Sequence, residues 1–228
     1  MGAVASIDFA QSGWSQHGEV LPPQLRADLL ARFDAHVADR AGRRSGLAHA
    51  VVRALAAAPT VRALVEPILG RAAFAFRATL FDKHAVANWL VAWHQDRMVP
   101  VHERIEAAGF GPWSDKADDG VFVQPPEAVL HTLLAVRVDL DGSNAGNGGL
   151  RLLPGTHHAG VMSRDRIAAA VAAGTVVVPD IPAGGALRLR PLVLHASPAS
   201  NGLSHRRIVH IEFAPCELPA PVRFRTRV

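Results

Sequence analysis

The hydrophobic pattern changes its period near residue 71, and this change constrains the fold more than any other feature. Before it, Leu25, Leu29 and Phe33 recur every four residues, as on one face of a helix. After it come apolar runs of strand length, such as "AAFAFRATLFD", "TLLAVRVDLD", "GTVVVPDIP" and "RRIVHIEFAP", separated by Gly, Pro, Asn and Asp. Strands that follow one another without helices between them argue against a parallel nucleotide-binding sheet.

We therefore predict a mainly β fold, an antiparallel sandwich or jelly roll, with N-terminal helices packed on one outer face. The expected organisation is a single domain over residues 1–228, with a helical part over about 20–71 and a β core over about 72–215. The segment 104–124 is rich in glycine and charge. We expect it to form a long loop or a short helix beside the functional site, because long loops in compact domains are usually functional.

Composition excludes several classes of protein. The chain is 49% apolar, which is ample for a buried core, and its formal net charge is only +4. The basic residues are scattered and no aromatic residues interleave with them, so we expect no nucleic-acid partner. Cys216 is the only cysteine, which rules out an intrachain disulfide and a cysteine-based zinc cluster. No apolar run reaches the ~18 residues of a membrane span, so we expect a cytoplasmic protein without a membrane partner. The oligomeric state is not indicated.

The stretch "WHQD" carries the first chemical signal. On a strand, residues two apart share a face, so His94 and Asp96 lie side by side. His195 ends the apolar run "RPLVLHAS", where a polar ring requires a specific use. Two histidines and one carboxylate form the set that binds Fe(II) and leaves coordination positions open. A simple hydrogen-bonded His–Asp pair and a buried core histidine remain the alternative.

Arg206 follows His195 after a turn rich in Pro, Asn and Gly, so its strand returns beside the candidate metal site. A guanidinium there can bind a carboxylate through two hydrogen bonds, and Ser197, on the face of His195, can add a hydroxyl. Strand alternation places Arg206 and His210 on one face and Arg207 on the other. Because the Arg207 face is the more apolar, the pattern alone leaves open which face points inward.

Three stretches together resemble the phytanoyl-CoA dioxygenase family of Fe(II)/2-oxoglutarate oxygenases: "FDKHAVANWLVAWHQD", "VRVDLDGSNAGNGGLRLLPGTHHAG" and "GGALRLRPLVLHASPASNGLSHRRIVHIEF". The resemblance implies a double-stranded β-helix, the jelly roll of cupins. It also implies iron ligands at the HxD pair and a distal histidine, matched here by His94, Asp96 and His195. An arginine eleven residues beyond that histidine is matched by Arg206, which favours the inward facing of that residue.

The resemblance further implies the reaction. Fe(II), O2 and 2-oxoglutarate, with ascorbate as a supporting reductant, would oxidise a C–H bond of a small organic metabolite, usually by hydroxylation, and release succinate and CO2. Arg206 and Ser197 would hold 2-oxoglutarate, and similarity adds Asn88 to this group. The other candidate functions are a metal-binding cupin-like protein or enzyme that does not use 2-oxoglutarate, a halogenase and a non-catalytic small-molecule binder. A halogenase would need a small residue in place of Asp96.

The remaining polar and aromatic residues receive structural interpretations. Trp89 and Trp93 are expected to pack against helices, and no role is assigned to Lys83. The other histidines considered are expected to have structural or rim positions: His102, His131, His157, His158, His205 and His210.

Overall fold

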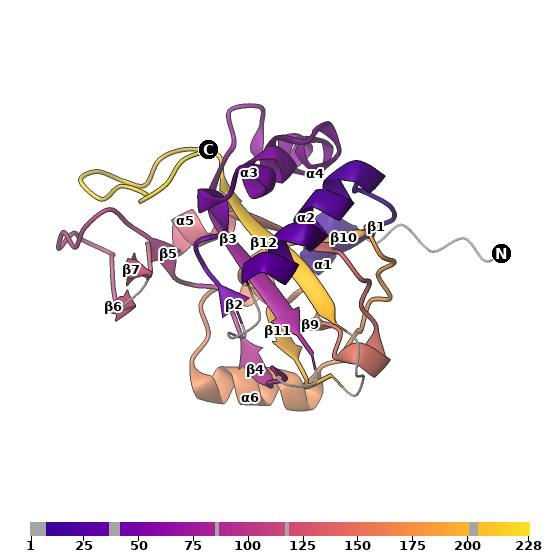
Figure 1. Cartoon of the computed structure of the whole chain (residues 1–228). Helices are drawn as coiled ribbons and strands as arrows, with labels where there is room; N and C mark the ends of the chain where they lie inside the picture. Colours follow the sequence, from indigo (N-terminus) through magenta and orange to yellow (C-terminus); the bar gives the residue numbers. More distant parts are fainter. Residues whose placement is uncertain (1–7, 37–41, 85–86, 117–118, 201–204) are drawn as a thin grey trace.

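The computed structural model describes residues 8–36, 42–84, 87–116, 119–200 and 205–228 (Figure 1). Its helices are α1 (Phe9–Ser12), α2 (Pro23–His36), α3 (Ala50–Ala57), α4 (Pro59–Leu69), α5 (Glu127–Thr132) and α6 (Arg164–Ala173). Its strands are β1 (Trp14–His17), β2 (Gly42–Arg43), β3 (Phe74–Lys83), β4 (Val91–His94), β5 (Val99–Pro100), β6 (Trp113–Lys116), β7 (Gly120–Val123), β8 (Leu134–Asp139), β9 (Arg151–Leu153), β10 (Ala186–Leu189), β11 (Leu194–Ser197) and β12 (Arg206–Ala214). Within these ranges no helix is long and apolar enough to cross a membrane.

Two antiparallel sheets form the jelly roll. The major sheet has the order β1-β10-β8-β12-β3-β2, and the minor sheet has the order β4-β11-β9. In Figure 1 the minor sheet lies behind β3 and β12, whereas α2 and α3 lie in front of them. The predicted fold class is therefore confirmed. The expectation of one domain over the whole chain stays a prediction.

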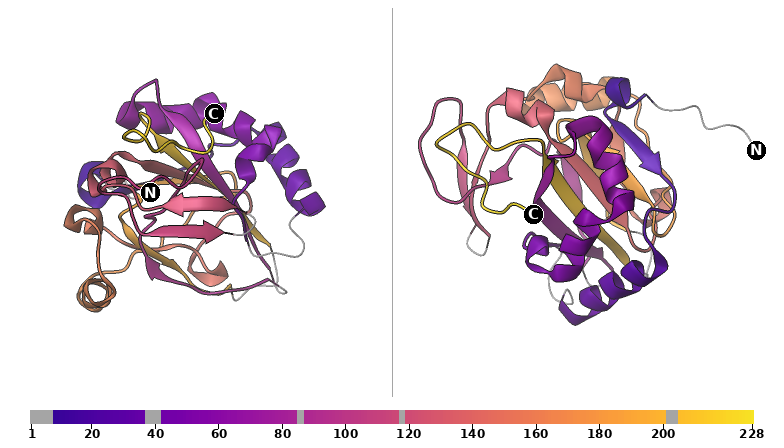
Figure 2. Two further views of the ribbon diagram at one scale, coloured as in Figure 1. Left: turned by 90° about the vertical axis from the view of Figure 1, so that its left-hand side faces the viewer. Right: turned by 90° about the horizontal axis from the view of Figure 1, so that it is seen from above.

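The helices α2, α3 and α4 cover the outer face of the major sheet, as the turned views show (Figure 2). Phe33, Leu55 and Val65 from these helices share one buried cluster with Val209 and Ile211 of β12. Both faces of β12 are therefore buried, the outer one against apolar helices. This packing explains why the Arg207 face of the strand reads as the more apolar of the two.

Three sequence expectations about local structure are wrong. The segment 104–124 is not a simple loop or helix, because β6 and β7 form a hairpin in it that pairs with β5. The run "GTVVVPDIP" makes only isolated bridges, at Val177 and Ile181, in place of a strand. Helix α6 lies among the strands, although Ser163 at its N-cap and Gly174 at its C-cap are recognisable helix signals.

Candidate metal centre

A cavity of about 560 Å³ lies between the two sheets and is lined by β3, β8 and β12 on one side and by β4 and β11 on the other. His94, Asp96 and His195 line it, as do Arg206 and Ser197. The structure thus brings five of the six predicted site residues to one cavity.

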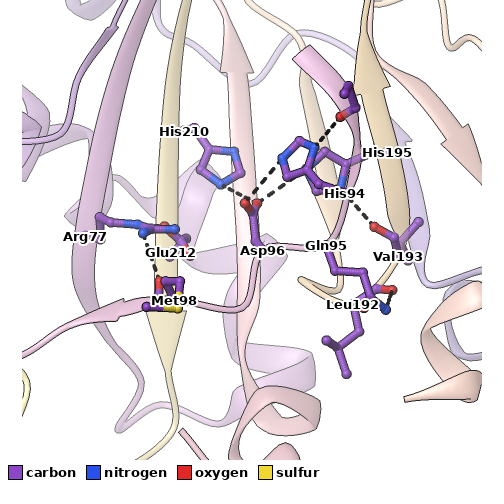
Figure 3. A network of polar contacts seen from close by, with 11 residues as sticks. Arg77, His94, Gln95, Asp96, Met98, Leu192, Val193, His195, His210 and Glu212 are labelled. Atoms are coloured by element: carbon purple, nitrogen blue, oxygen red, sulfur yellow. Dashed lines mark hydrogen bonds and ion pairs between the residues drawn. The ribbon is translucent and has the colours of Figure 1, made fainter. Parts of the chain in front are cut away.

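His94 and His195 face each other across the pairing of β4 with β11, with their ring centroids 4.2 Å apart. Asp96 follows β4 and its backbone N–H donates a hydrogen bond to the carbonyl of Pro191 at 2.9 Å. The carboxylate lies 3.7 Å from His94 Nε2 and 3.5 Å from His195 Nε2 (Figure 3). One ligand atom from each of the three residues lies within 4.8 Å of the other two, a spacing that suits one shared metal ion.

Backbone carbonyls orient both imidazole rings. His94 Nδ1 lies 2.8 Å from the carbonyl oxygen of Ala92, and His195 Nδ1 lies 2.8 Å from that of Val193. A carbonyl only accepts hydrogen bonds, so each Nδ1 carries the proton and each Nε2 presents a lone pair. Histidines that bind metals are commonly held in this way. The donor set and its orientation therefore fit a divalent metal ion.

The charges of the cluster keep Asp96 ionised. Burial would raise the pKa of Asp96, but His195, His94 and the nearby His210 hold it well below its usual range. Burial and the neighbouring His195 lower the pKa of His94. For His195, burial opposes the charge of Asp96, and the net effect raises the pKa of its ring. The carboxylate is thus available as an anionic ligand at neutral pH.

His210 belongs to this site, although its sequence context indicated only a structural position. It is buried on β12, and its Nε2 lies 3.6 Å from an oxygen of Asp96. Burial lowers the pKa of His210 to about 3, so its ring is neutral. Next to it, Glu212 forms a buried ion pair with Arg77 (Figure 3). Strand alternation puts His210 and Arg206 on the same face of β12, and this pattern could have placed His210 at the site from the sequence.

Arg206 points inward, as the resemblance implied, and is only 2% exposed. Its NH2 donates a hydrogen bond to Ser197 Oγ at 3.0 Å, whereas Nε and NH1 find no partner among the described residues. Lys83 lies opposite it on β3 and donates hydrogen bonds to Ser197 Oγ and to the carbonyl of Pro198, both at 2.8 Å. Ser197 Oγ donates in turn to the carbonyl of Gly148 at 3.0 Å.

Asn88 is placed differently. Its side-chain amide donates to the carbonyl of Ser200 at 2.7 Å, and its oxygen accepts from the backbone N–H of Ser200 at 2.6 Å. These two hydrogen bonds link the segment of Asn88 to that of Ser200. Asn88 is not among the residues that line the cavity. Its predicted contact with a cosubstrate stays a prediction.

The two tryptophans also differ. Trp93 packs against the same buried cluster as Ile167 and Val171 of α6. Trp89 instead lines the cavity, with Lys83 Nζ 5.2 Å from its ring centroid.

A jelly roll with two histidines and one carboxylate facing a cavity between its sheets is typical of the class of non-haem iron oxygenases. Residues 21–208 match the family model described as phytanoyl-CoA dioxygenase. The chain belongs to this family and is an Fe(II)/2-oxoglutarate-dependent oxygenase by class. Among curated proteins, no sequence matches the chain significantly.

Solved structures share the fold at low sequence identity. The epimerase SnoN, in complex with Fe3+, alpha-ketoglutarate and nogalamycin RO, is 17% identical, with a TM-score of 0.67 over 96% of this chain and 83% of its own. EctD from S. alaskensis, with 2-oxoglutarate and 5-hydroxyectoine, is 16% identical, with a TM-score of 0.69 over 94% and 76%. AviO1 from Streptomyces viridochromogenes Tue57 is 20% identical, with a TM-score of 0.66 over 92% and 93%.

Proposed function

We propose that the protein couples the oxidative decarboxylation of 2-oxoglutarate to succinate with hydroxylation, or another C–H oxidation, of a small organic metabolite. His94, Asp96 and His195 hold Fe(II), and Arg206 with Ser197 holds the distal carboxylate of 2-oxoglutarate. Fe(II) bound there supplies the oxidising chemistry together with O2, and ascorbate serves only to keep the metal reduced. The SnoN structure in complex with Fe3+ and alpha-ketoglutarate and the EctD structure with 2-oxoglutarate support this assignment.

The observation that carries the proposal is the guanidinium of Arg206, which forms no ion pair within the described ranges and whose Nε and NH1 have no hydrogen-bond partner there. A buried charge without a partner is costly, so this arginine requires an anion in the cavity that the metal triad also faces. A cupin-like enzyme that does not use 2-oxoglutarate has no need of such a group. A halogenase is disfavoured because the Asp96 carboxylate occupies the coordination position that a halide would take.

The chain itself supplies binding, orientation and exclusion of water. Ser197 Oγ accepts a hydrogen bond from Lys83 and another from Arg206, so it positions both cationic side chains in the cavity. Phe81, Leu150 and Phe122 contribute apolar lining, which keeps water from the reacting atoms. A cavity of about 560 Å³ lies within the range that small-ligand sites occupy, so a small metabolite fits beside the cosubstrate.

The test is an anaerobic titration of the Fe(II)-loaded protein with 2-oxoglutarate, followed by visible absorption. A bidentate 2-oxo acid chelate gives a weak charge-transfer band, which we expect in the intact protein. Arg206→Met should shift the titration midpoint about 10- to 100-fold upward, because it removes hydrogen bonds to a charged group. Arg207→Met is the matched control and should keep the midpoint, because this neighbour pairs with Asp141 instead.

Two results would contradict the proposal. Iron binding without any band at saturating 2-oxoglutarate would favour a metal protein that does not use this cosubstrate. Equal shifts for the two arginine variants would show that Arg206 is not the carboxylate anchor. Succinate release with iron, ascorbate and 2-oxoglutarate provides the second, catalytic measurement.

A further inference from the structure

The cavity between the two sheets is lined mainly by positive charge. Of the 24 lysines and arginines in the chain, seven line it, whereas Asp96 is the only lining residue among the described aspartates and glutamates. Asp96 is itself one of the proposed metal ligands. A divalent metal ion and the two carboxylates of 2-oxoglutarate carry opposite charges of equal size, so their binding leaves the excess of positive charge unchanged.

Carboxylates beside the cavity balance part of this charge. Glu212 forms a buried ion pair with Arg77 (Figure 3), and Asp119 forms one with Arg44, with 3.0 Å between Arg44 NH1 and a carboxylate oxygen. Arg44 and Arg77 therefore have their charge partners within the protein.

Three more cations lie on the inner face of the major sheet: Lys83 on β3, Arg137 on β8 and Arg206 on β12. Burial lowers the pKa of both arginines, and the carboxylate of Asp139 opposes this effect on each of them. Burial also lowers the pKa of Lys83 to about 7, so this side chain carries only part of a charge at neutral pH. Under the proposed function Arg206 in addition binds 2-oxoglutarate, so these three cations are also accounted for.

Arg97 and Lys116 are the two cations of the lining that have no carboxylate partner among the described residues. Arg97 is half-buried, directly follows Asp96 and donates one hydrogen bond, from NH1 to the carbonyl of Met162 at 3.4 Å. Lys116 ends β6, is exposed, and its side chain forms no hydrogen bond or ion pair within the described ranges. The lining thus has one such cation next to a proposed metal ligand and another at its exposed rim.

Much of the remaining lining is aromatic. Phe81, Trp89 and Phe122 all face the cavity, and the ring centroid of Phe81 lies 6.4 Å from that of His210, which in turn contacts Asp96. Such a surface suits a ligand with an apolar body. The two cations without a carboxylate partner suit a ligand that also carries a negative charge.

We propose that the organic substrate is an anion with an apolar body, and that Arg97 and Lys116 favour it over neutral molecules of similar shape. The inference rests on the proposed function and narrows its substrate class. A cleft lined by charge of one sign concentrates ligands of the opposite sign and raises their rate of association. The charged group is a carboxylate or a phosphate ester, because lysine and arginine side chains bind both.

The experiment measures binding and not turnover. Three ligands that share a phenyl ring are compared: phenylacetate, phenyl phosphate and the neutral 2-phenylethanol. Each is titrated calorimetrically under anaerobic conditions into protein saturated with Mn(II) and 2-oxoglutarate, so that Arg206 is already occupied. We expect at least one of the two anions to bind about 10-fold or more tightly than the alcohol, and this preference to shrink as the salt concentration is raised. The tighter of the two anions identifies the charged group.

The variants Arg97→Met and Lys116→Met remove one charge each and keep an unbranched side chain. Each should weaken binding of the preferred anion about 2- to 10-fold and leave binding of the alcohol nearly unchanged, and the double variant should lose the preference for the anion. Arg97→Lys keeps the charge and should keep most of the preference. Arg151→Met, at an exposed position of β9 outside the lining, is the matched control and should bind all three ligands normally.

Three results overturn the inference: equal binding of the anions and the alcohol by the wild type, no binding of any of the three ligands, or an anion preference that persists in the double variant. A melting curve of each variant shows that it is folded, and Lys116→Met, at an exposed position, gives the comparison if Arg97→Met does not fold. Failure of the wild type to bind 2-oxoglutarate in the preceding saturation step would instead overturn the proposed function.

Discussion

Lys83 makes the stability of the ligand-free protein depend on pH in a way that can be measured. Its side chain is 2% exposed, and burial together with Arg206 and Arg137 lowers its pKa from 10.5 to about 7. Between these two pKa values the unfolded chain binds a proton that the folded chain does not. The free energy of unfolding therefore rises with pH across this range, and the penalty for burying the charge is fully present below about pH 7.

The expected size of the effect follows from the composition. The chain has no tyrosine, one cysteine, and Lys83 and Lys116 as its only lysines. Burial lowers the pKa of Arg206 to about 9, so this residue adds to the rise only near the upper end of the range. Lys116 and Cys216 are both exposed. A difference of one bound proton between the unfolded and the folded chain changes the free energy of unfolding by about 1.4 kcal/mol per pH unit. Between about pH 7.5 and 9 this free energy should therefore rise by up to about 2 kcal/mol.

The assay is urea unfolding of the metal-free protein at several pH values in this window. Lys83→Met should remove the rise, and Lys116→Met, the matched control, should retain it. Saturating 2-oxoglutarate with metal should flatten the curve of the wild type, because a bound dianion raises the pKa of Lys83. A wild-type curve that is already flat, or one that keeps its slope in Lys83→Met, would refute the reasoning.

Three further predictions concern the metal centre and its surroundings. His195→Ala should abolish Mn(II) binding in calorimetry. His210→Phe leaves the three proposed ligands in place and should weaken Mn(II) binding by no more than about 10- to 100-fold. An equal loss of binding in the two variants would make His210 a ligand. With Asp96 present, turnover in excess chloride should give only oxygenated or desaturated product by mass spectrometry, and a chlorinated product would contradict its proposed role. Arg77→Met leaves Glu212 buried without its partner and should cost about 3 to 5 kcal/mol in urea unfolding; a loss below about 1 kcal/mol would show that the ion pair does not stabilise the fold.

The sequence was sufficient to predict that the three candidate metal ligands come together, because each of them has a local signal. His94 and Asp96 share a strand face through their spacing, and His195 interrupts an apolar run. The facing of Arg206 was not settled by the pattern, because alternation is informative only where one face of a strand meets water. In this fold the outer face of β12 packs against α2–α4, so apolar residues occur on the outside and charged ones within.

Other features had no usable signal. Arg137 lies in the apolar run "LLAVRVDL". There it alternates with apolar residues in the same way as a strand residue that faces solvent. Its place in the cavity lining, opposite His210, becomes visible only when β8 is placed next to β12. Asn88 shares a strand face with His94 in the sequence pattern, but the amide pairs with Ser200, which is 112 positions later in the chain. Contacts at such separation depend on the tertiary fold and not on local spacing.

The division of the site between two sheets has a consequence for the length of the keto acid. The three proposed metal ligands belong to the minor sheet and the segment that follows β4, whereas Arg206, the proposed anchor of the distal carboxylate, belongs to the major sheet. Facing sheets are held about 10 Å apart by the side chains packed between them. The distance between the two sheets therefore sets the length of the molecule that can reach from the metal ligands to Arg206. This distance is fixed by the packing of the whole sandwich. Under the proposed assignment, a four-carbon or six-carbon homologue of 2-oxoglutarate would be rejected by span alone, even though it offers the same two ends.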